Sequence, residues 1–305
     1  MGKISVAEIK DLMKSTGVGM MDCKKALEAN DGDMDKAIEF LREKGLATQA
    51  KKSGRAAAEG IVTAVVNGNT GVLLEVNTET DFAANTDDIK NFVNAVANTI
   101  IEKNPADVEA LKAETISGGT ATVGDVLTEL AGMKIRENIV IRRFVRMEGV
   151  LASYIHNGGS IGVMVKMDTA LSADQVSVIG KDVAMQSAAL NAPYLKREDV
   201  PAEVIEKEKE IMLAQMAEDP KMANKPEQVR VKIVEGKVGK YYSENCLLEQ
   251  AFVKDDKLTV KGYVDAEAKK LGGEIVVTDV IRYERGEGVE KKEDNLADEV
   301  AKMIK

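Results

Sequence analysis

Residues 75 to 85 carry the groups best suited to act on another molecule. They read Glu-Val-Asn-Thr-Glu-Thr-Asp-Phe-Ala-Ala-Asn and lead from a hydrophobic strand into a helix. Asp81 and Phe82 stand together at this junction, in a chain with five Phe and no Trp. A projecting Asp-Phe pair can insert its ring into a partner's pocket and bring a carboxylate beside the partner's charges. The ordinary alternative, which these residues alone favour, is that Thr80 or Asp81 caps the helix while Phe82 packs beneath it.

Carboxylates in the same segment suggest a second kind of chemistry. Glu75, Glu79 and Asp81 could serve a metal-dependent hydrolase if they converged on a cation. However, the sequence places no histidine beside them to complete a ligand set, and it contains neither a GxSxG nor a GxxxxGK[ST] motif. These residues leave an enzyme open without calling for one, and we expect no bound metal and no cofactor.

The remaining candidate groups are few. The single histidine, His156, precedes the Asn-Gly-Gly sequence of a predicted turn, where a turn residue is the ordinary interpretation. Cys23 and Cys246 lie far apart without CxxC spacing, which favours reduced thiols and disfavours a zinc site. We expect Cys23 to be a small core residue.

Composition limits the possible partners and location. The 305 residues suffice for two or three domains, and the net charge of −9 disfavours extended contact with nucleic acid. No apolar run approaches the ~18 residues of a membrane span, and the N-terminus lacks a secretion signal. A cytoplasmic protein that contacts other proteins is therefore expected.

The N-terminal region has the pattern of a small helical module. Residues 1 to 46 predict three short helices, of which the third ends at Gly45. Residues 47 to 58, rich in Ala, Lys and Gly, predict a linker that is at most partly helical. Met20 and Met21 follow a Gly-bounded turn; both could lie in the core of this module, but two adjacent residues at a helix start favour one exposed Met.

The rest of the chain contains an internal repeat that predicts an α+β fold. We expect two subdomains, residues 59 to 147 and 148 to 285, each a three-stranded antiparallel sheet covered by helices. The third strands are expected at residues 135 to 147 and 274 to 283. Asn and Gly supply the positive φ that tight hairpin turns need. The hairpins are Glu59-Gly60-Ile61-Val62 through Asn67-Gly68-Asn69 to Gly71-Val72-Leu73-Leu74, and Glu148-Gly149-Val150-Leu151 through Asn157-Gly158-Gly159 to Gly162-Val163-Met164-Val165.

An insertion in the second subdomain, at about residues 196 to 242, predicts an antiparallel helical hairpin. Its apolar stripes could cover its own subdomain or join a second copy of the chain in a homodimer. Residues 286 to 305 predict a C-terminal helical tail. The residues expected to form the stripes are Val204, Ile205, Ile211, Met212 and Met216, followed by Val229, Ile233, Val234, Val238 and Tyr241.

Two motifs give the chain a specific resemblance. Residues 12 to 27, Leu-Met-Lys-Ser-Thr-Gly-Val-Gly-Met-Met-Asp-Cys-Lys-Lys-Ala-Leu, closely resemble the N-terminal signature of the bacterial elongation factor Ts family. Residues 75 to 85 resemble that family's second signature, and the similarity covers essentially the whole chain. The resemblance implies a UBA-like arrangement of the N-terminal helices. It also implies a guanine nucleotide exchange factor that binds elongation factor Tu and promotes GDP release.

The resemblance assigns roles to particular residues. It implies that the loop of Thr80, Asp81, Phe82 and Ala83 enters the GTPase near its Mg²⁺ and that Phe82 wedges between helices beside the nucleotide. Secondary contacts are implied for four residues: Met20, Met21, Ile135 and His156.

Three positions depart from the family pattern. Thr78 stands where Ser or Cys is usual, Ala83 where Val is usual, and Arg136 where some relatives have Gly. The alternative to an exchange factor is a binding module, chaperone-like or for storage, that grips the GTPase and leaves its GDP off-rate unchanged.

Overall fold

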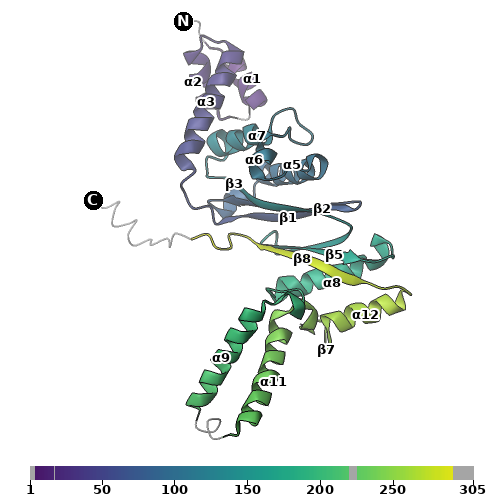
Figure 1. The fold of residues 1–305 in the computed structure, drawn as a ribbon. Helices are drawn as coiled ribbons and strands as arrows, with labels where there is room; N and C mark the ends of the chain where they lie inside the picture. Colours follow the sequence, from purple (N-terminus) through teal and green to yellow (C-terminus); the bar gives the residue numbers. More distant parts are fainter. Residues whose placement is uncertain (1–3, 17, 220–224, 291–305) are drawn as a thin grey trace.

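The computed structural model describes residues 4–16, 18–219 and 225–290, and its N-terminal region is a bundle of three helices (Figure 1). These are α1 (Val6–Thr16), α2 (Met20–Ala29) and α3 (Met34–Lys52). The Asp33 side chain caps α3 by accepting a hydrogen bond from the Lys36 N–H. The bundle core forms around the fully or almost fully buried side chains of Leu12, Leu27 and Leu41.

The prediction that α3 ends at Gly45 is wrong, because this glycine serves helix packing. The helix continues for seven residues to Lys52 and crosses η1 (Leu130–Lys134), a π-helical turn that follows α7 (Val123–Glu129). A Cβ on Gly132 would lie 2.3 Å from the carbonyl oxygen of Gly45. The absence of side chains at both positions therefore lets the two backbones touch.

Two three-stranded antiparallel sheets follow, as the repeat predicts. In the first sheet the strand order is β1-β2-β3, and in the second it is β4-β5-β8. The third strands begin later than predicted, since residues 135 to 139 form an irregular segment before the first of them. The strands are β1 (Glu59–Asn67), β2 (Thr70–Thr78), β3 (Val140–Glu148), β4 (Val150–His156), β5 (Ile161–Asp168) and β8 (Val276–Glu284).

The two hairpins share backbone features as well as sequence. Gly60 and Gly149, which are equivalent in the repeat, both have strongly positive φ, +133° and +131°. The register of the first sheet shifts between Glu75 and Val76, and that of the second shifts at the equivalent place, between Lys166 and Met167. Such bulges re-aim side chains, so both copies of the repeat deviate from regular strand geometry in the same way.

The sheets pack face to face, and helices cover their outer faces (Figure 1). A Cβ on Gly71 would lie 2.7 Å from Leu151, and one on Gly162 would lie 2.5 Å from Val62, so these glycines permit the close approach. The helices are α4 (Asp81–Ala84), α5 (Asp87–Lys103), α6 (Val108–Ala113) and α7 on the first sheet, and α8 (Ala173–Ala189) and α12 (Val260–Lys270) on the second. Short elements complete the second half: η2 (Arg197–Asp199), η3 (Leu247–Glu249), β6 (Ala251–Phe252) and β7 (Asp255–Thr259).

The insertion forms a pair of helices, α9 (Ala202–Glu218) and α11 (Glu227–Asn245), that projects from the body (Figure 1). Its buried residues Ile205, Met216, Val234 and Val238 pack against one another, so the stripe is used within the hairpin itself. Two residues assigned to the stripe, Ile211 and Val229, are instead 41% and 40% exposed. The buried stripe therefore closes the hairpin on itself, and its contact with a second copy stays a prediction.

The predicted C-terminal helix lies mostly outside the described residues. Residues 286 to 288 form a turn after β8, and 289 and 290 are irregular. Within the part of the chain that the structure describes, no helix is both long enough and apolar enough to cross a membrane.

Candidate partner-binding site

The loop between β2 and α4 is fixed by hydrogen bonds around Thr80. The Thr80 hydroxyl accepts a hydrogen bond from the Ala83 N–H at 3.2 Å and caps α4, as the sequence predicts. The Thr78 hydroxyl donates to the Thr80 carbonyl at 2.7 Å. Ala83 and Ala84 are 4% and 2% exposed, so the far side of this single helical turn is packed against the protein.

Phe82 points away from the body. Its side chain is 83% exposed, the largest exposed fraction among the large apolar side chains of the described residues. Asp81 beside it is also exposed. The packing alternative is therefore wrong for Phe82, although its other half, the cap by Thr80, is confirmed. Covering this ring with a partner would contribute about 1.5–3 kcal/mol.

A second segment of the chain holds the base of this loop. The Glu137 carboxylate accepts hydrogen bonds from the Thr80 N–H at 3.0 Å and from the Thr80 hydroxyl at 2.8 Å. In return, the Glu79 carboxylate accepts a hydrogen bond from the Asn138 N–H at 2.6 Å. Nothing in the local sequence around Glu137 indicated this contact, which spans 57 residues.

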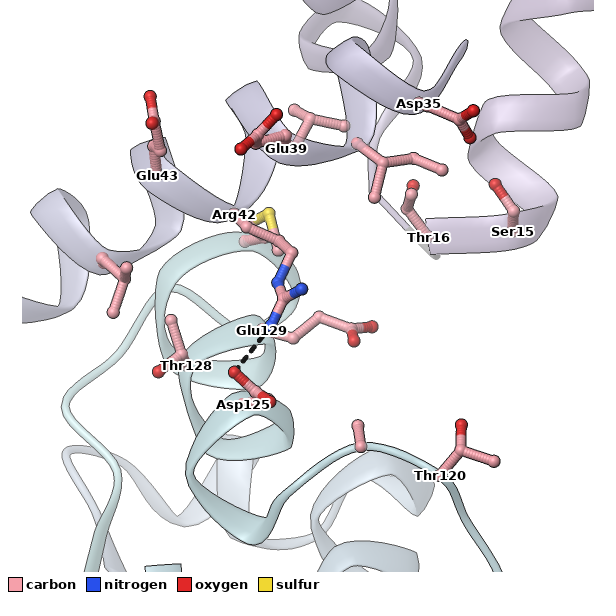
Figure 2. Close-up of a pocket in the computed structure, with 15 residues that line it drawn as sticks. Ser15, Thr16, Asp35, Glu39, Arg42, Glu43, Thr120, Asp125, Thr128 and Glu129 are labelled. Carbon is pink, nitrogen blue, oxygen red and sulfur yellow. Dashed lines mark hydrogen bonds and ion pairs between the residues drawn. The ribbon is translucent and has the colours of Figure 1, made fainter. Parts of the chain in front are cut away.

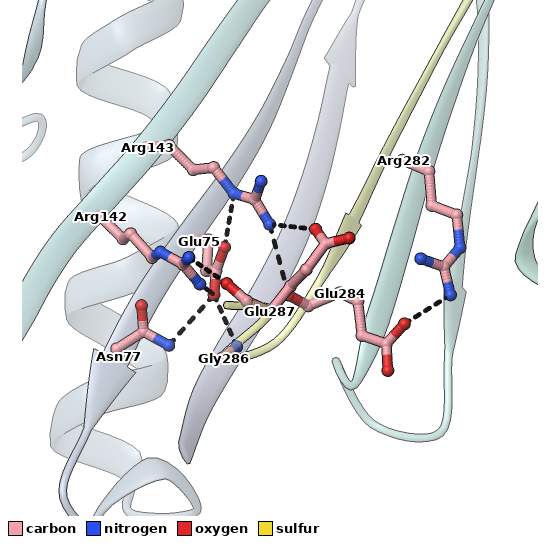
Figure 3. Close-up of polar contacts among 8 residues, drawn as sticks. All are labelled: Glu75, Asn77, Arg142, Arg143, Arg282, Glu284, Gly286 and Glu287. Atoms are coloured by element: carbon pink, nitrogen blue, oxygen red, sulfur yellow. Dashed lines mark hydrogen bonds and ion pairs between the residues drawn. The ribbon is translucent and has the colours of Figure 1, made fainter. Parts of the chain in front are cut away.

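Glu75, the first carboxylate of the motif, has a structural role. Its side chain is fully buried and forms ion pairs with Arg142 at 3.0 Å and Arg143 at 2.6 Å (Figure 3). It also accepts hydrogen bonds from the Asn77 amide at 3.1 Å and from the Gly286 N–H at 2.8 Å. The carboxylate thereby joins the first sheet to the segment that follows β8.

These partners set the ionisation of Glu75, a carboxylate on which the hydrolase alternative depends. Burial alone would raise the pKa of this carboxyl, but the hydrogen bonds from Gly286, Arg143 and Asn77 outweigh it and lower the pKa. Because Asn77, Arg142 and Gly286 contact Oε1 and Arg143 contacts Oε2, this buried carboxylate is engaged within the protein. Across the described residues, no three His, Cys, Asp or Glu side chains are placed to hold a metal ion.

Of the secondary residues, the two methionines are accessible. Met20 and Met21 begin α2 and are 51% and 64% exposed, so both point outward where one was expected to. Ile135 is half-buried against the core of the first sheet. Cys23 is fully buried, and this burial raises the pKa of its thiol, consistent with a core residue.

The backbone conformation at Arg136 is one that glycine adopts easily. Its φ is +61°, in the left-handed region that favours glycine. Its guanidinium pairs with Asp22 of α2, and its carbonyl oxygen accepts a hydrogen bond from the Lys52 ammonium. Arg136 therefore has a strained backbone conformation. Its ion pair and its carbonyl oxygen connect the N-terminal bundle to the first sheet.

His156 lies at the exposed end of β4, at the tip of the second hairpin. Its Nδ1 atom is 3.1 Å from the Tyr154 hydroxyl. The same tip is attached to the first sheet, because the Gly159 carbonyl accepts a hydrogen bond from the Val62 N–H at 2.8 Å. The histidine is thus presented on a fixed turn.

A cavity of about 750 Å³ lies elsewhere, between α3 and α7 (Figure 2). Arg42 crosses it to pair with Asp125 at 2.7 Å, and the other charged residues on its walls are all carboxylates. It contains neither Asp81 nor Phe82. The candidate site is therefore a projecting surface and not a pocket.

Comparison with known proteins shows which family the chain resembles. Residues 79–287 match the family model described as Elongation factor TS. The elongation factor Ts of Trichlorobacter lovleyi is 47% identical over 308 residues, covering 98% of this chain and 97% of that protein. Those of Syntrophotalea carbinolica and Clostridium kluyveri are 45% and 46% identical over 307 residues, covering 99% of this chain and 100% and 99% of their own lengths. The chain belongs to the elongation factor Ts family.

Proposed function

We propose that the loop of Thr80 to Ala83 releases GDP from elongation factor Tu by displacing the Mg²⁺ ion of that GTPase. Membership of the elongation factor Ts family makes the chain a nucleotide exchange factor for elongation factor Tu in translation elongation, and not an enzyme. The observation that carries the mechanism is the 83% exposed Phe82 ring on a capped and clamped turn.

The mechanism follows from how a GTPase holds GDP. The diphosphate is bound by a metal ion and by backbone amides, so its affinity depends on the groups that place the metal's ligands. Phe82 inserts between the helices that carry these groups, while the Asp81 carboxylate brings a competing negative charge. Metal and phosphate contacts weaken together, and GDP leaves without any covalent step.

Exchange of this kind has no intrinsic direction. If the factor loosens the nucleotide, binding of nucleotide must loosen the factor to the same extent. The chain therefore speeds equilibration, and the cellular excess of GTP over GDP determines which nucleotide is bound afterwards. This role places the protein in the cytoplasm.

The outlying residues extend the same interface. The exposed Met20 and Met21 give α2 an apolar end that a helix of the GTPase can cover, and His156 offers a polar contact from its fixed hairpin tip. Ile135, already half-buried against the core of the first sheet, offers a smaller apolar surface to the same partner.

The domain organisation is part of this proposal. We assign residues 1 to 46 to a UBA-like module, 47 to 58 to a linker, 59 to 147 and 148 to 285 to the two core subdomains, and 286 to 305 to the tail. Association of two copies through the hairpin stays a prediction, which sedimentation velocity can test. The exposed apolar residues on its helices that could support such contact are Ile211, Leu213, Val229 and Val231.

The test measures release of fluorescently labelled GDP from elongation factor Tu with catalytic amounts of the chain. If the release step loses about 1.5–3 kcal/mol of ring burial, Phe82→Ala should be roughly 10- to 150-fold slower. Asp81→Ala should slow release to a smaller extent. Phe40→Ala removes another exposed Phe, 36% accessible on α3, and should leave the rate unchanged.

Each failure has a clear meaning. Normal rates with both Asp81→Ala and Phe82→Ala would refute the role of the loop. Tight binding by the unmodified chain without any acceleration of GDP release would instead identify the non-exchanging binding module.

A further inference from the structure

We propose that Glu137 is a positioning residue for Phe82. Its carboxylate orients the cap of α4 and holds the exposed ring ready for insertion. This inference rests on the proposed function of the Thr80 to Ala83 loop and adds a residue to it that makes no contact with the ring.

A chain of hydrogen bonds runs from Glu137 through Thr80 to α4. The Thr80 hydroxyl has one proton to donate and lone pairs to accept. It donates that proton to Glu137 at 2.8 Å, so its lone pairs are left for the Ala83 N–H at 3.2 Å. A charged acceptor strengthens and orders such a chain. Glu137 therefore determines how the cap faces the helix that carries Phe82.

Both carboxylate oxygens of Glu137 are used on the same residue. Oε1 binds the Thr80 hydroxyl, and Oε2 binds the Thr80 N–H at 3.0 Å. Two bonds from one planar group to one residue leave that residue little freedom to rotate. Since Thr80 immediately precedes α4, this bidentate contact fixes the direction in which the turn leaves the sheet.

A reciprocal contact keeps Glu137 itself in place. The next residue, Asn138, donates its backbone N–H to Glu79 at 2.6 Å, and its side-chain amide donates to the Arg55 carbonyl at 2.7 Å. Arg55 in turn pairs with Glu79 at 3.4 Å. Residues 79–80 and 137–138 thus form a closed clamp, which also includes the segment between α3 and β1.

The clamp matters because the ring has no support of its own. With 83% of its surface exposed, Phe82 gains its position only from the backbone beneath it. A turn that is ordered before binding does not lose that freedom on insertion, whereas a loose turn must be ordered at the partner's surface. Removing Glu137 should therefore slow GDP release although the ring and the Asp81 carboxylate remain.

The experiment combines GDP release with a double-mutant cycle. Glu137→Ala should lower the release rate at saturating factor by about 10-fold, because two hydrogen bonds to a charged group are lost. Glu137→Gln keeps one acceptor oxygen and should lose less. In an Asp81→Ala/Phe82→Ala background, Glu137→Ala should change the rate by less than about 2-fold, because neither active side chain of the turn is left to position. Glu109→Ala, on the exposed surface of α6, is the matched control.

Amide hydrogen exchange of the free protein provides the independent readout. Glu137→Ala and Glu137→Gln should speed exchange at Thr80 while leaving the amides of β1 and β2 protected, and Glu109→Ala should do neither. If Glu137→Ala does not fold, Glu137→Gln carries both measurements.

The outcomes separate the inference from the proposed function. If Phe82→Ala slows release and the Glu137 variants do not, the positioning role is wrong and the function of the loop stands. Equal losses from Glu137→Ala in both backgrounds would also overturn it, because the carboxylate would then act independently of the ring. If Phe82→Ala has no effect, the proposed function fails first.

Discussion

Removal of the buried Glu75 carboxylate is the most demanding test of how the fold is held together. In Glu75→Ala, the guanidinium groups of Arg142 and Arg143 lose their shared partner, and the Gly286 N–H loses its acceptor (Figure 3). Arg142 and Arg143 are themselves only 25% and 31% exposed, so water replaces the carboxylate incompletely. The variant therefore leaves two partly buried guanidinium groups, of which only Arg143 keeps a carboxylate partner, Glu287 at 3.1 Å.

The size of the effect follows from this burial. Breaking a buried ion pair by removing one partner costs about 3–5 kcal/mol. Glu148→Ala is the matched control, since Glu148 also pairs with an arginine, Arg146, at 2.6 Å but is 62% exposed. Exposed pairs contribute about 0–1 kcal/mol. The two substitutions remove the same chemical group and should differ by several kcal/mol.

Urea denaturation followed by circular dichroism at pH 7 measures both free energies of unfolding. Glu75→Ala should shift the midpoint strongly and Glu148→Ala only slightly. Values for the two variants within about 1 kcal/mol of each other would refute the assignment of Glu75 as the buried tie between the sheet and the segment after β8.

The same carboxylate gives a pH dependence of known sign. The pKa of Glu75 in the folded protein is lowered from its ordinary value of 4.5. The folded state therefore holds the proton less tightly than the unfolded chain, and stability from this group is complete above pH 4.5 and lost as the pH falls through the folded pKa. Unfolding experiments at successive pH values give the difference in the free energy of unfolding between wild type and Glu75→Gln. This difference should be constant at neutral pH and shrink below pH 4.5. A difference that grows on acidification contradicts the sign.

Two further predictions concern backbone geometry, and thermal unfolding tests both. Gly132→Ala should destabilise the protein by about 1–3 kcal/mol because its Cβ would overlap the Gly45 carbonyl. By contrast, Gly236→Ala should stabilise the protein by about 0.5–1 kcal/mol, because it lies in α11 and no heavy atom is within 4 Å of the new Cβ. If both substitutions changed the free energy of unfolding in the same direction, the close contact at Gly132 would be wrong. At Arg136, substitution by Ala or by Gly removes the ion pair with Asp22. Only Gly also removes the strain of the left-handed backbone conformation, so Arg136→Gly should be about 1 kcal/mol more stable than Arg136→Ala. Equal stabilities would show that no strain is stored there.

The local elements were the most predictable part of the fold. Asn157 and Gly158 adopt φ of +45° and +63° at the second hairpin tip, as their residue types indicate. The Thr80 cap was equally predictable, because its hydroxyl accepts a hydrogen bond from a residue only three positions away. Features of this kind are encoded in a few neighbouring residues, so a single sequence is sufficient to predict them.

Features that depend on residues far apart in the chain could not be predicted from the sequence. The local sequence predicts a helix end at Gly45, because Gly132, which requires the missing side chain, lies far along the chain. Phe82 was expected to be buried on the evidence of its own segment, because hydrophobicity alone does not distinguish a core ring from an exposed one. Glu137 was missed for the same reason: its contact with Thr80 joins residues 57 positions apart.

The central claim, that the exposed Phe82 ring releases GDP by disturbing the metal site of elongation factor Tu, is tested most directly by varying Mg²⁺. Stopped-flow release of labelled GDP at saturating factor should be compared for wild type and Phe82→Ala, with millimolar Mg²⁺ and again with the metal chelated. With Mg²⁺ the wild type should be faster by about 10-fold or more. Without the metal that advantage should fall below about 2-fold, because the contact that the ring disturbs is already gone. An advantage of the same size under both conditions would contradict the account.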